Sequence, residues 1–270
     1  MLDEYSFGDI YIRHAIDETP DEKEFIMHIH DRCEIYFFVS GNVEYLVEGS
    51  KYPLNENSLM IMRPAEAHSP KITGSSTYER YALNFPLDFA KEIDTEKRLL
   101  TPFTGRLLGK DNMFSADEMD MKLVHKLFSE MCSENDDYGK RLTINTHLIT
   151  LLDMINRAFG EKKKSGKKRR STSERIVIYV NEHLTEDISV SMLAEHFYLS
   201  VSQFNRVFRQ ATGASPWDYV IKKRLTIAKE LIRNGISAQE AAERCGFGDY
   251  SVFYRAYIRN FGYPPKHSRF

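Results

Sequence analysis

Short apolar or alternating stretches, each ended by turn-forming residues, run through positions 5–86. Four of these stretches span 34–39, 43–47, 58–62 and 78–85. Ser40, Gly41 and Asn42 separate the first two. Strands of about five or six residues joined by tight turns with Gly and Asn are typical of an antiparallel sandwich or barrel. The pattern therefore predicts an all-β N-terminal region.

The period of the apolar positions becomes that of a helix after Ser115. Two apolar series follow, one at Met119, Leu123, Leu127 and Met131, and one at Ile144, Leu148, Leu151 and Ile155. This spacing predicts two amphipathic helices. The helices either cover the barrel or form the interface of a homodimer, because a helical hairpin with an apolar stripe can pair with a copy of itself.

Two short helices separated by two or three residues are predicted within 189–210. Ser189 precedes an apolar-faced segment, and Ser200 and Gln203 have the spacing of a capping box, in which each side chain bonds to the backbone of the other residue. This arrangement predicts a helix-turn-helix motif. The residues expected to be buried on its second helix are Phe204, Val207 and Phe208.

The same arrangement occurs a second time. Ser237 and Glu240 form another capping box, and Asp249 caps a helix whose expected apolar residues are Val252, Phe253, Tyr257 and Phe261. Between the two copies, a helix is expected from Pro216 to Gly235. Such a helix is about 27 to 30 Å long. It would hold the two second helices roughly one duplex turn, about 34 Å, apart.

Polar residues on both second helices are candidates for contact with DNA. In the major groove, Asn pairs with adenine and Arg with guanine. The candidates are Ser202, Asn205, Arg206 and Arg209 on the first helix and Ser251, Tyr254, Arg255 and Arg259 on the second. One such helix could be an ordinary solvated surface, but the repetition at this spacing favours a protein that binds double-stranded DNA.

The C-terminal part of the chain resembles the DNA-binding domain of the AraC/XylS transcription regulators. The anchors of the resemblance are Ala194, Ser200, Phe204, Phe208, Gly213, Pro216, Arg224, Leu225, Ala228, Ala241, Gly246, Phe247, Phe253, Arg255, Phe261 and Pro264. The resemblance implies that Ser202, Asn205 and Arg206 contact bases from the first recognition helix. It implies the same role for Ser251, Tyr254 and Arg255 on the second.

Histidines and a carboxylate are expected to converge inside the N-terminal barrel. His28, His30 and Glu34 share one face with Tyr36 and Phe38 if the strand is regular. Their spacing resembles the first cupin motif, and the segment from Pro64 to His68 resembles the second. In metal cupins, the positions of His28, His30, Glu34 and His68 are those of the metal ligands.

Three interpretations of this cluster stay open. It is an effector pocket, a site for Fe, Mn, Ni or Zn, or a set of hydrogen-bonded structural histidines. We favour an effector pocket without metal or cofactor, for a small molecule such as a carbohydrate. A ligand with a carboxylate, which would pair with Arg80, is the other class that the sequence leaves open. The polar contacts would come from His28, His30, Glu34, His68 and Arg80, and the apolar walls from Tyr36, Phe38 and Met62.

The net charge of the 270 residues, −2, hides an uneven distribution. Residues 1–160 contain 17 Lys and Arg against 28 Asp and Glu, whereas residues 161–270 contain 20 against 11. Seven of those positive charges lie in the low-complexity segment 161–170. Such a segment is solvated and typical of a linker. A basic C-terminal part fits a polyanionic partner.

These observations predict four regions. They are a cupin-like effector-binding barrel at 1–112, a helical hairpin at 113–160, a basic linker at 161–171 and an all-α DNA-binding domain at 172–270. The three cysteines show no CxxC pairing, and we find neither a signal peptide nor an apolar run long enough for a membrane. We therefore expect a cytoplasmic protein with reduced thiols and no membrane partner.

The predicted function is that of a transcription regulator, not an enzyme. A small molecule would control its binding to promoter DNA, and it would act as a homodimeric activator with RNA polymerase as a further partner. The alternative is a metal-dependent cupin enzyme, an oxygenase or isomerase, fused to a DNA-binding module. That alternative leaves the repeated helix-turn-helix motif unexplained.

Overall fold

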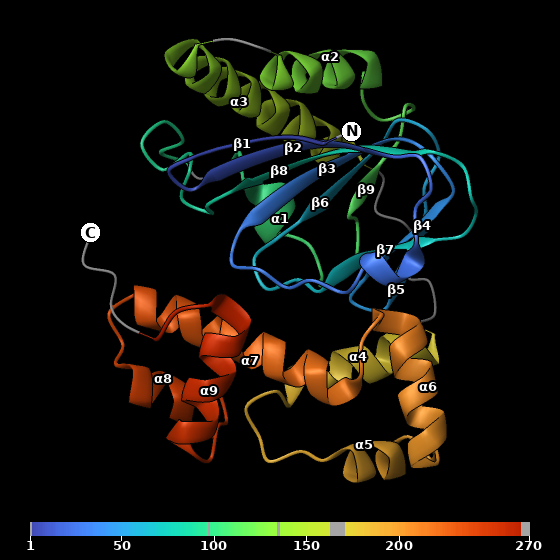
Figure 1. Ribbon diagram of the computed structural model, residues 1–270, viewed down its shortest axis with the longest axis vertical. Helices are drawn as coiled ribbons and strands as arrows, with labels where there is room; N and C mark the ends of the chain where they lie inside the picture. Colours follow the sequence, from blue (N-terminus) through green and yellow to red (C-terminus); the bar gives the residue numbers. More distant parts are fainter. Residues whose placement is uncertain (1, 97, 134–135, 163–170, 266–270) are drawn as a thin grey trace.

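The computed structural model describes residues 2–96, 98–133, 136–162 and 171–265. Two helices lie over one face of a large β-sheet, a smaller sheet faces the other side, and the C-terminal helices lie beyond the smaller sheet (Figure 1). The predicted linker falls mostly on 163–170, outside the described residues. None of the helices in the described part of the chain has the length and apolar character needed to cross a membrane.

The N-terminal domain is built from antiparallel strands, as predicted. Within the described ranges, the larger sheet has the order β1-β2-β8-β3-β6-β9 and the smaller β5-β4-β7. The larger sheet's strands, in that order, are Leu2–Phe7, Ile10–Asp17, Tyr78–Phe85, Cys33–Ser40, Ser58–Met62 and Met113–Phe114. Those of the smaller are Ser50–Pro53, Val43–Val47 and His68–Ile72. Because β9 pairs with β6, the sheet extends just past the predicted boundary at 112.

Strand β3 reads as a continuous apolar run because both of its faces are buried. Ile35 and Phe37 point into the core beneath the covering helices. Tyr36 and Phe38 point the other way, into the cluster between the two sheets. The alternation of a strand thus gives one face to the helices and the other to the barrel interior.

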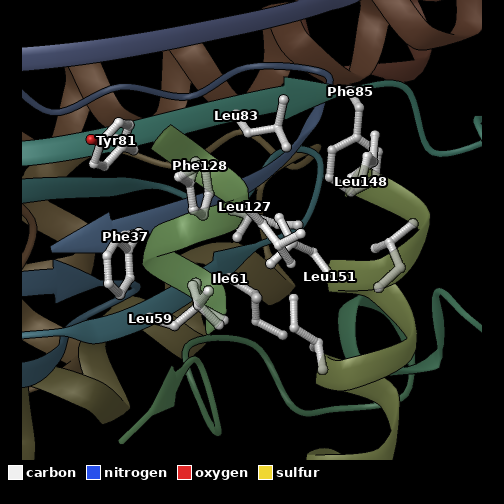
Figure 2. Packing of buried hydrophobic residues seen from close by; sticks show 14 of the residues in the cluster. Phe37, Leu59, Ile61, Tyr81, Leu83, Phe85, Leu127, Phe128, Leu148 and Leu151 are labelled. Atoms are coloured by element: carbon white, nitrogen blue, oxygen red, sulfur yellow. The ribbon is translucent and has the colours of Figure 1, made fainter. Parts of the chain in front are cut away.

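Helices α2 (Met121–Cys132) and α3 (Asp137–Glu161) cover the larger sheet. Figure 2 shows Leu127 and Phe128 of α2 and Leu148 and Leu151 of α3 packed with Phe37, Leu59, Ile61, Tyr81, Leu83 and Phe85. The predicted apolar series of α3 is buried throughout, but Leu123 of α2 is 38% exposed. Val124 and Phe128 are buried instead, because a strict four-residue spacing drifts around a helix of 3.6 residues per turn.

The C-terminal domain contains the two predicted helix pairs. Its helices are α4 (Thr172–Glu182), α5 (Val190–His196), α6 (Val201–Thr212), α7 (Pro216–Arg233), α8 (Ala238–Arg244) and α9 (Tyr250–Phe261). The capping box of Ser200 and Gln203 opens α6, and Asp249 caps α9. The pairs α5/α6 and α8/α9 lie at opposite ends of α7 (Figure 1). The 18 residues of α7 give it a length of about 27 Å.

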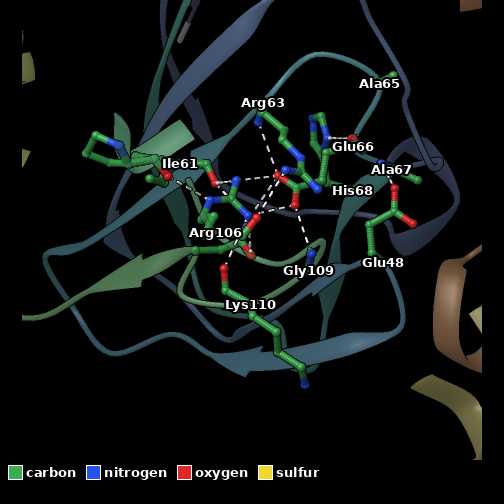
Figure 3. A network of polar contacts seen from close by, with 12 residues as sticks. Glu48, Ile61, Arg63, Ala65, Glu66, Ala67, His68, Arg106, Gly109 and Lys110 are labelled. Carbon is green, nitrogen blue, oxygen red and sulfur yellow. Dashed lines mark hydrogen bonds and ion pairs between the residues drawn. The ribbon is translucent and has the colours of Figure 1, made fainter. Parts of the chain in front are cut away.

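A buried ion pair fixes the turn between β6 and β7. Glu66 and Arg106 both have fully buried side chains, and they form a bidentate pair (Figure 3). Arg106 follows the short helix α1 (Thr101–Thr104). Glu66 also accepts hydrogen bonds from the backbone N–H groups of Arg63 and Gly109 and from the Asn112 amide. Its charge is therefore compensated from several directions, as a buried carboxylate requires.

The Glu66–Arg106 pair makes stability depend on pH. Burial by itself would raise the pKa of Glu66, but the hydrogen bonds and charge of Arg106 hold that pKa below its usual 4.5. A carboxyl whose pKa is depressed in the folded state contributes stability above its ordinary pKa and loses it as the pH falls through the folded value. Glu66→Gln should lower the free energy of unfolding at pH 7 by about 3 to 5 kcal/mol. The difference from the native chain should shrink below pH 4.5.

Urea unfolding at several pH values measures this difference. Glu96→Gln is the matched control, because Glu96 pairs with Arg98 on the exposed surface and should contribute about 0 to 1 kcal/mol. A difference for Glu66→Gln that stays constant from pH 7 to the acid limit of folding would contradict the prediction.

Candidate functional sites

A polar cavity of about 320 Å³ lies in the interior of the barrel. Five of the six predicted effector residues line it, namely His28, His30, Glu34, Tyr36 and Arg80. The sixth, His68, lies behind Glu34, with its Nε2 atom 3.5 Å from that carboxylate. The structure therefore brings the predicted pocket residues together.

The two leading histidines are not on the strand that carries Glu34. Strand β3 begins at Cys33, so the expectation that His28, His30 and Glu34 follow one regular strand is wrong. His28 instead pairs with His68 through two backbone hydrogen bonds of 2.9 and 3.1 Å. This isolated bridge draws the segment before β3 against the start of β7, so the imidazoles still meet at the cavity.

Three groups of this cluster come close enough to share an ion. His30, Glu34 and His68 each offer one ligand atom, and these atoms lie within 4.8 Å of one another. His28 is outside this set, although the sequence placed it among the four metal-cupin positions. The Nε2 atom of His30 is 2.9 Å from Glu34 Oε2.

Charge and burial act against each other in this cluster. Burial alone would raise the pKa of Glu34, but the charge of His68 and a hydrogen bond with His30 hold that pKa well below its usual value. Burial alone would lower the pKa of His68, but the charge of Glu34 outweighs burial and raises that pKa. The pocket therefore contains an ionised carboxylate between imidazoles.

Aromatic rings surround the Arg80 guanidinium on one side of the cavity. It forms an ion pair with Asp17 and lies 4.2 Å from the centroid of the Tyr78 ring and 5.1 Å from that of Phe25. Tyr36 and Tyr78 are joined by a hydrogen bond between their hydroxyls. The walls differ from those predicted, because Phe38 and Met62 are fully buried behind the cavity.

The sequence did not indicate the contribution of strand β2. Tyr11, Arg13 and Asp17 line the cavity because β2 pairs with β8, placing Arg13 opposite Ala82. Arg13 Nε is buried and finds no hydrogen-bond partner among the described residues. The alternating pattern of β2 was visible in the sequence, but its pairing with a strand about 65 residues later was not.

The recognition helices expose most of the predicted DNA-contacting residues. On α6, Phe204 and Phe208 are buried while Ser202, Arg206 and Arg209 are exposed. Asn205 is half-buried, and its side-chain amide donates to the carbonyl of Val201 at 2.8 Å. Val207, predicted to be buried, is only partly so.

Helix α9 repeats this division of faces. Phe253 and Tyr257 are buried, and the predicted residues Ser251, Tyr254, Arg255 and Arg259 are exposed. Val252 was expected in the core but is 48% exposed, and Phe261 is partly exposed. Residue 252 precedes the buried Phe253 by one position, or about 100° around the helix, which turns it away from the core.

Arg224 in the middle of α7 fixes the relation between the two halves of the C-terminal domain. Its guanidinium donates to the carbonyls of Leu184, Glu186 and Gly246 at 2.6, 2.7 and 2.6 Å. The first two precede α5, and Gly246 lies in the turn between α8 and α9. One planar side chain thus ties both motifs to α7.

A buried polar junction joins the barrel to α7. Glu48 stands at the tip of the β4–β5 hairpin, where it and Gly49 both have positive φ, 48° and 80°. This conformation is typical of a two-residue hairpin turn but unusual for Glu. The Glu48 carboxylate accepts hydrogen bonds from the backbone N–H of Ala67, Lys223 Nζ, the Asn181 amide and the Tyr219 hydroxyl.

Two chain segments beside the pocket also contact α7. Lys223 donates to the carbonyl of Ala65, two residues past Arg63 in the turn that leads to His68. Lys222 donates to the carbonyl of Met27 at 3.1 Å, and Lys229 pairs with Asp31 at 2.9 Å. Segments 27–31 and 65–68 therefore bring histidines to the pocket region. The Met27 and Ala65 carbonyls and the Asp31 carboxylate of the same segments contact α7.

Comparisons with known proteins match both parts of the chain. Residues 13–152 match the family described as the AraC-like ligand binding domain, and residues 193–269 match a helix-turn-helix domain.

Relatives extend over almost the whole chain. A probable transcriptional regulator, LumQ of Photobacterium leiognathi, is 28% identical over 94% of this chain and 95% of its own length. The HTH-type transcriptional activator RhaS of Citrobacter koseri is 21% identical over 94% of this chain and 91% of its own. Among solved structures, the DNA-binding domain of the global transcriptional factor AdpA, in complex with a target DNA, is 32% identical over 36% of this chain and 87% of its own, with a TM-score of 0.34.

The junction should be sensitive to the loss of either charge. Lys223→Met leaves the Glu48 carboxylate buried without its cation, which should cost about 3 to 5 kcal/mol of stability. The double variant Glu48→Gln, Lys223→Met should cost less than the sum of the two single variants, because neither charge is then left unpaired.

Urea unfolding gives these energies, and amide hydrogen exchange of Ala67 and α7 reports the local opening. Lys110→Met is the control, since Lys110 and Glu174 also join the two domains but are more exposed, at 35% and 18%. The prediction would be contradicted if the losses in the free energy of unfolding for Glu48→Gln and Lys223→Met were additive in the double variant. It would also be contradicted if Lys223→Met and Lys110→Met lowered that free energy equally.

Proposed function

This chain belongs to the AraC family of transcription regulators, and from that premise we propose that a small polar effector in the barrel controls its sequence-specific binding to promoter DNA. The proposed division follows the predicted regions, with an effector barrel at 1–112, a hairpin at 113–160, a linker at 161–171 and a DNA-binding domain at 172–270.

The observation that carries the proposal is the position of α6 and α9 at opposite ends of α7 (Figure 1). Each is capped at its N-terminus, buries aromatic residues on one face and leaves polar residues on another. Recognition helices contact base edges through residues near their N-terminal ends. We assign base contacts to Ser202, Asn205 and Arg206 of α6 and to Ser251, Tyr254 and Arg255 of α9, with Arg209 and Arg259 as further DNA contacts.

A carbohydrate is the effector class that the cavity fits best. Its hydroxyls need both donors and acceptors, which Arg80, Glu34 and the histidines supply. Its ring faces need flat apolar surfaces, which Tyr36, Tyr45 and Tyr78 supply. A cavity of about 320 Å³ is at the small end of ligand pockets, which suits a monosaccharide.

The junction gives the effector a physical route to the DNA-binding domain. An effector that moves His28, His30 or His68 displaces segments that also hold Lys222, Lys223 and Lys229 of α7. Because α7 joins the two helix-turn-helix motifs, a change at its contacts alters the positions of α6 and α9 and with them the affinity for DNA. The coupling free energy then equals the difference in the effector's binding free energy between the chain that binds DNA well and the chain that binds it poorly.

We further propose a cytoplasmic homodimeric activator that contacts RNA polymerase. The apolar stripes of α2 and α3 face the sheet, so a partner would use their outer side, where Tyr138 and Leu142 are 76% and 54% exposed. These two residues are four positions apart on α3, which makes their side chains neighbours on the helix surface. Sedimentation velocity checks this proposal, and a monomer at micromolar concentration would contradict it.

Loss of a base-contacting arginine should relax sequence preference. Arg206→Ala and Arg255→Ala should each weaken binding by about 1 to 3 kcal/mol and relax preference at one or two base pairs. The measurement is selection from a randomised duplex pool followed by titration at rising salt. Arg157→Ala is the control, because Arg157 is an exposed arginine of α3 outside the DNA-binding domain. Binding of the native chain without sequence preference or salt dependence would end the proposal.

A bound sugar should stabilise the folded chain. At a concentration of 100 times its Kd, a ligand adds about 2.7 kcal/mol of stability. Thermal unfolding with a panel of pentoses, hexoses and uronic acids should therefore show a raised Tm with at least one of them. Arg80→Gln should abolish the increase, and Arg98→Gln, at an exposed arginine, should not. No shift with any sugar, or a shift that survives Arg80→Gln, would contradict the carbohydrate assignment.

A further inference from the structure

Most of the charged side chains around the barrel cavity already have a partner. Glu34 lies 2.9 Å from Nε2 of His30 and accepts a hydrogen bond from the Asn84 amide at 2.9 Å. Arg80 forms an ion pair with Asp17. A charge removed from water is stable only when it is compensated in such ways. A charged residue of the lining that lacks a partner is therefore a candidate for contact with a ligand.

Two charged residues of the lining, Arg13 and Glu24, form no ion pair among the described residues. Glu24 is exposed at the end of the short helix η1 (Glu22–Glu24), so water can solvate its carboxylate. Arg13 is only partly exposed, and its Nε atom is buried without a hydrogen-bond partner in the described part of the chain. A buried donor without a partner costs free energy, and more so in a charged group. Arg13 is therefore the uncompensated cation of the cavity.

The acid directly opposite Arg13 does not supply the missing charge. Arg13 lies on β2, between β1 and β8 in the larger sheet (Figure 1), and it is paired in register with Glu4 of β1. The Glu4 side chain is exposed and accepts a hydrogen bond from the Tyr11 hydroxyl at 2.8 Å instead. On the other side, β8 places the small side chain of Ala82 opposite Arg13. The guanidinium therefore has room beside it for part of a ligand.

Arg13 is also within reach of a ligand that contacts the other polar residues of the cavity. Arg80 and Asn84 lie two positions on either side of Ala82 on β8, and all three line the cavity. Diagonal neighbours across an antiparallel pair are within reach of long side chains. A molecule the size of one sugar ring can therefore contact Arg13 together with Arg80 or Asn84.

The ligand group that fits an unpaired guanidinium best is a carboxylate. Arginine presents a planar fork of donors that matches the two carboxylate oxygens. A hydroxyl of a neutral sugar could accept a hydrogen bond from Nε but would leave the positive charge uncompensated. An amine fits poorly, because Asp17 and Glu34 are already paired and Glu24 is solvated. A phosphate carries close to two negative charges at pH 7, and Arg13 can compensate only one of them.

We propose that the effector is a monosaccharide with a carboxylate, such as a hexuronate, and that Arg13 binds this carboxylate and determines specificity for the acid. The inference rests on the proposed function, which places a carbohydrate in the cavity, and deepens it by assigning a charge to the ligand. The sequence indicated Arg80 as the partner of a carboxylate. The structure points to Arg13 instead, because Arg80 is paired with Asp17 and lies over the Tyr78 ring.

Calorimetric titration of the full chain with matched ligands tests the inference. Glucuronate and galacturonate are each compared with the corresponding uronamide, which has nearly the same shape but no charge, and with glucose 6-phosphate. At least one uronate should bind about 10- to 100-fold more tightly than its amide, as expected for a hydrogen bond to a charged group. Glucose 6-phosphate should bind more weakly than that uronate.

Substitution of Arg13 should remove this preference. In Arg13→Gln, the affinity for the uronate should fall about 10- to 100-fold, whereas the affinity for the uronamide should stay the same. Arg13→Lys, which keeps the charge but not the planar fork, should retain part of the preference. Arg32→Gln is the matched control, because Arg32 pairs with Asp9 at 2.7 Å and does not line the cavity. It removes the same charge from the same domain and should leave both affinities unchanged.

Circular dichroism shows whether each variant has folded, and the comparison of uronate with uronamide on the native chain tests the inference even if Arg13→Gln does not fold. Equal affinities for acid and amide, tighter binding of glucose 6-phosphate, or a preference for the acid that survives in folded Arg13→Gln would overturn the inference. Each of these results leaves the proposed carbohydrate pocket in place. If no sugar of either kind binds, the carbohydrate assignment fails together with the inference, while binding to promoter DNA is tested separately.

Discussion

The buried pair of Glu66 and Arg106 is the constraint on which the working parts of this protein depend. It fixes the turn that ends at His68, and each neighbour of Glu66 in that turn has a different task. His68 contacts Glu34 of the cavity wall, the Ala67 amide donates to Glu48, and the Ala65 carbonyl accepts from Lys223. A turn with few buried contacts opens at a low cost in free energy. The buried ion pair raises that cost, and the turn can therefore hold all three contacts at once.

The pocket and the DNA-binding domain are therefore neighbours through the backbone of the same two segments. Residues 28 and 30 line the cavity and His68 contacts Glu34, while Met27, Asp31 and Ala65 contact α7. In the proposed mechanism, a ligand in the cavity would act on α7 by displacing a few residues of these segments. Arg224 then ties both recognition motifs to that helix, so the signal has a short physical path.

Much of the fold and part of the site were predictable because they depend on local signals. The capping residues Ser200 and Asp249 mark where α6 and α9 begin, and their aromatic residues mark the buried face. The pocket was predicted less completely. Its histidines were identified, but Arg13 and Asp17 were not, since their role depends on the pairing of β2 with β8. The burial of Leu123 and Val252 was predicted wrongly, because with 3.6 residues per turn both positions lie off the buried face of their helix.

The sequence by itself determined the elements of this protein, namely its strands, its capped helices, the spacing of its two motifs and the candidate residues for contact with DNA or a ligand. Only the tertiary structure decided which of these meet. Glu48, Lys223 and Tyr219 are far apart in the chain and carry no motif, yet they form the buried contact between the two domains. Local propensity acts over a few residues, whereas a buried charge is stable only where distant segments bring it a partner.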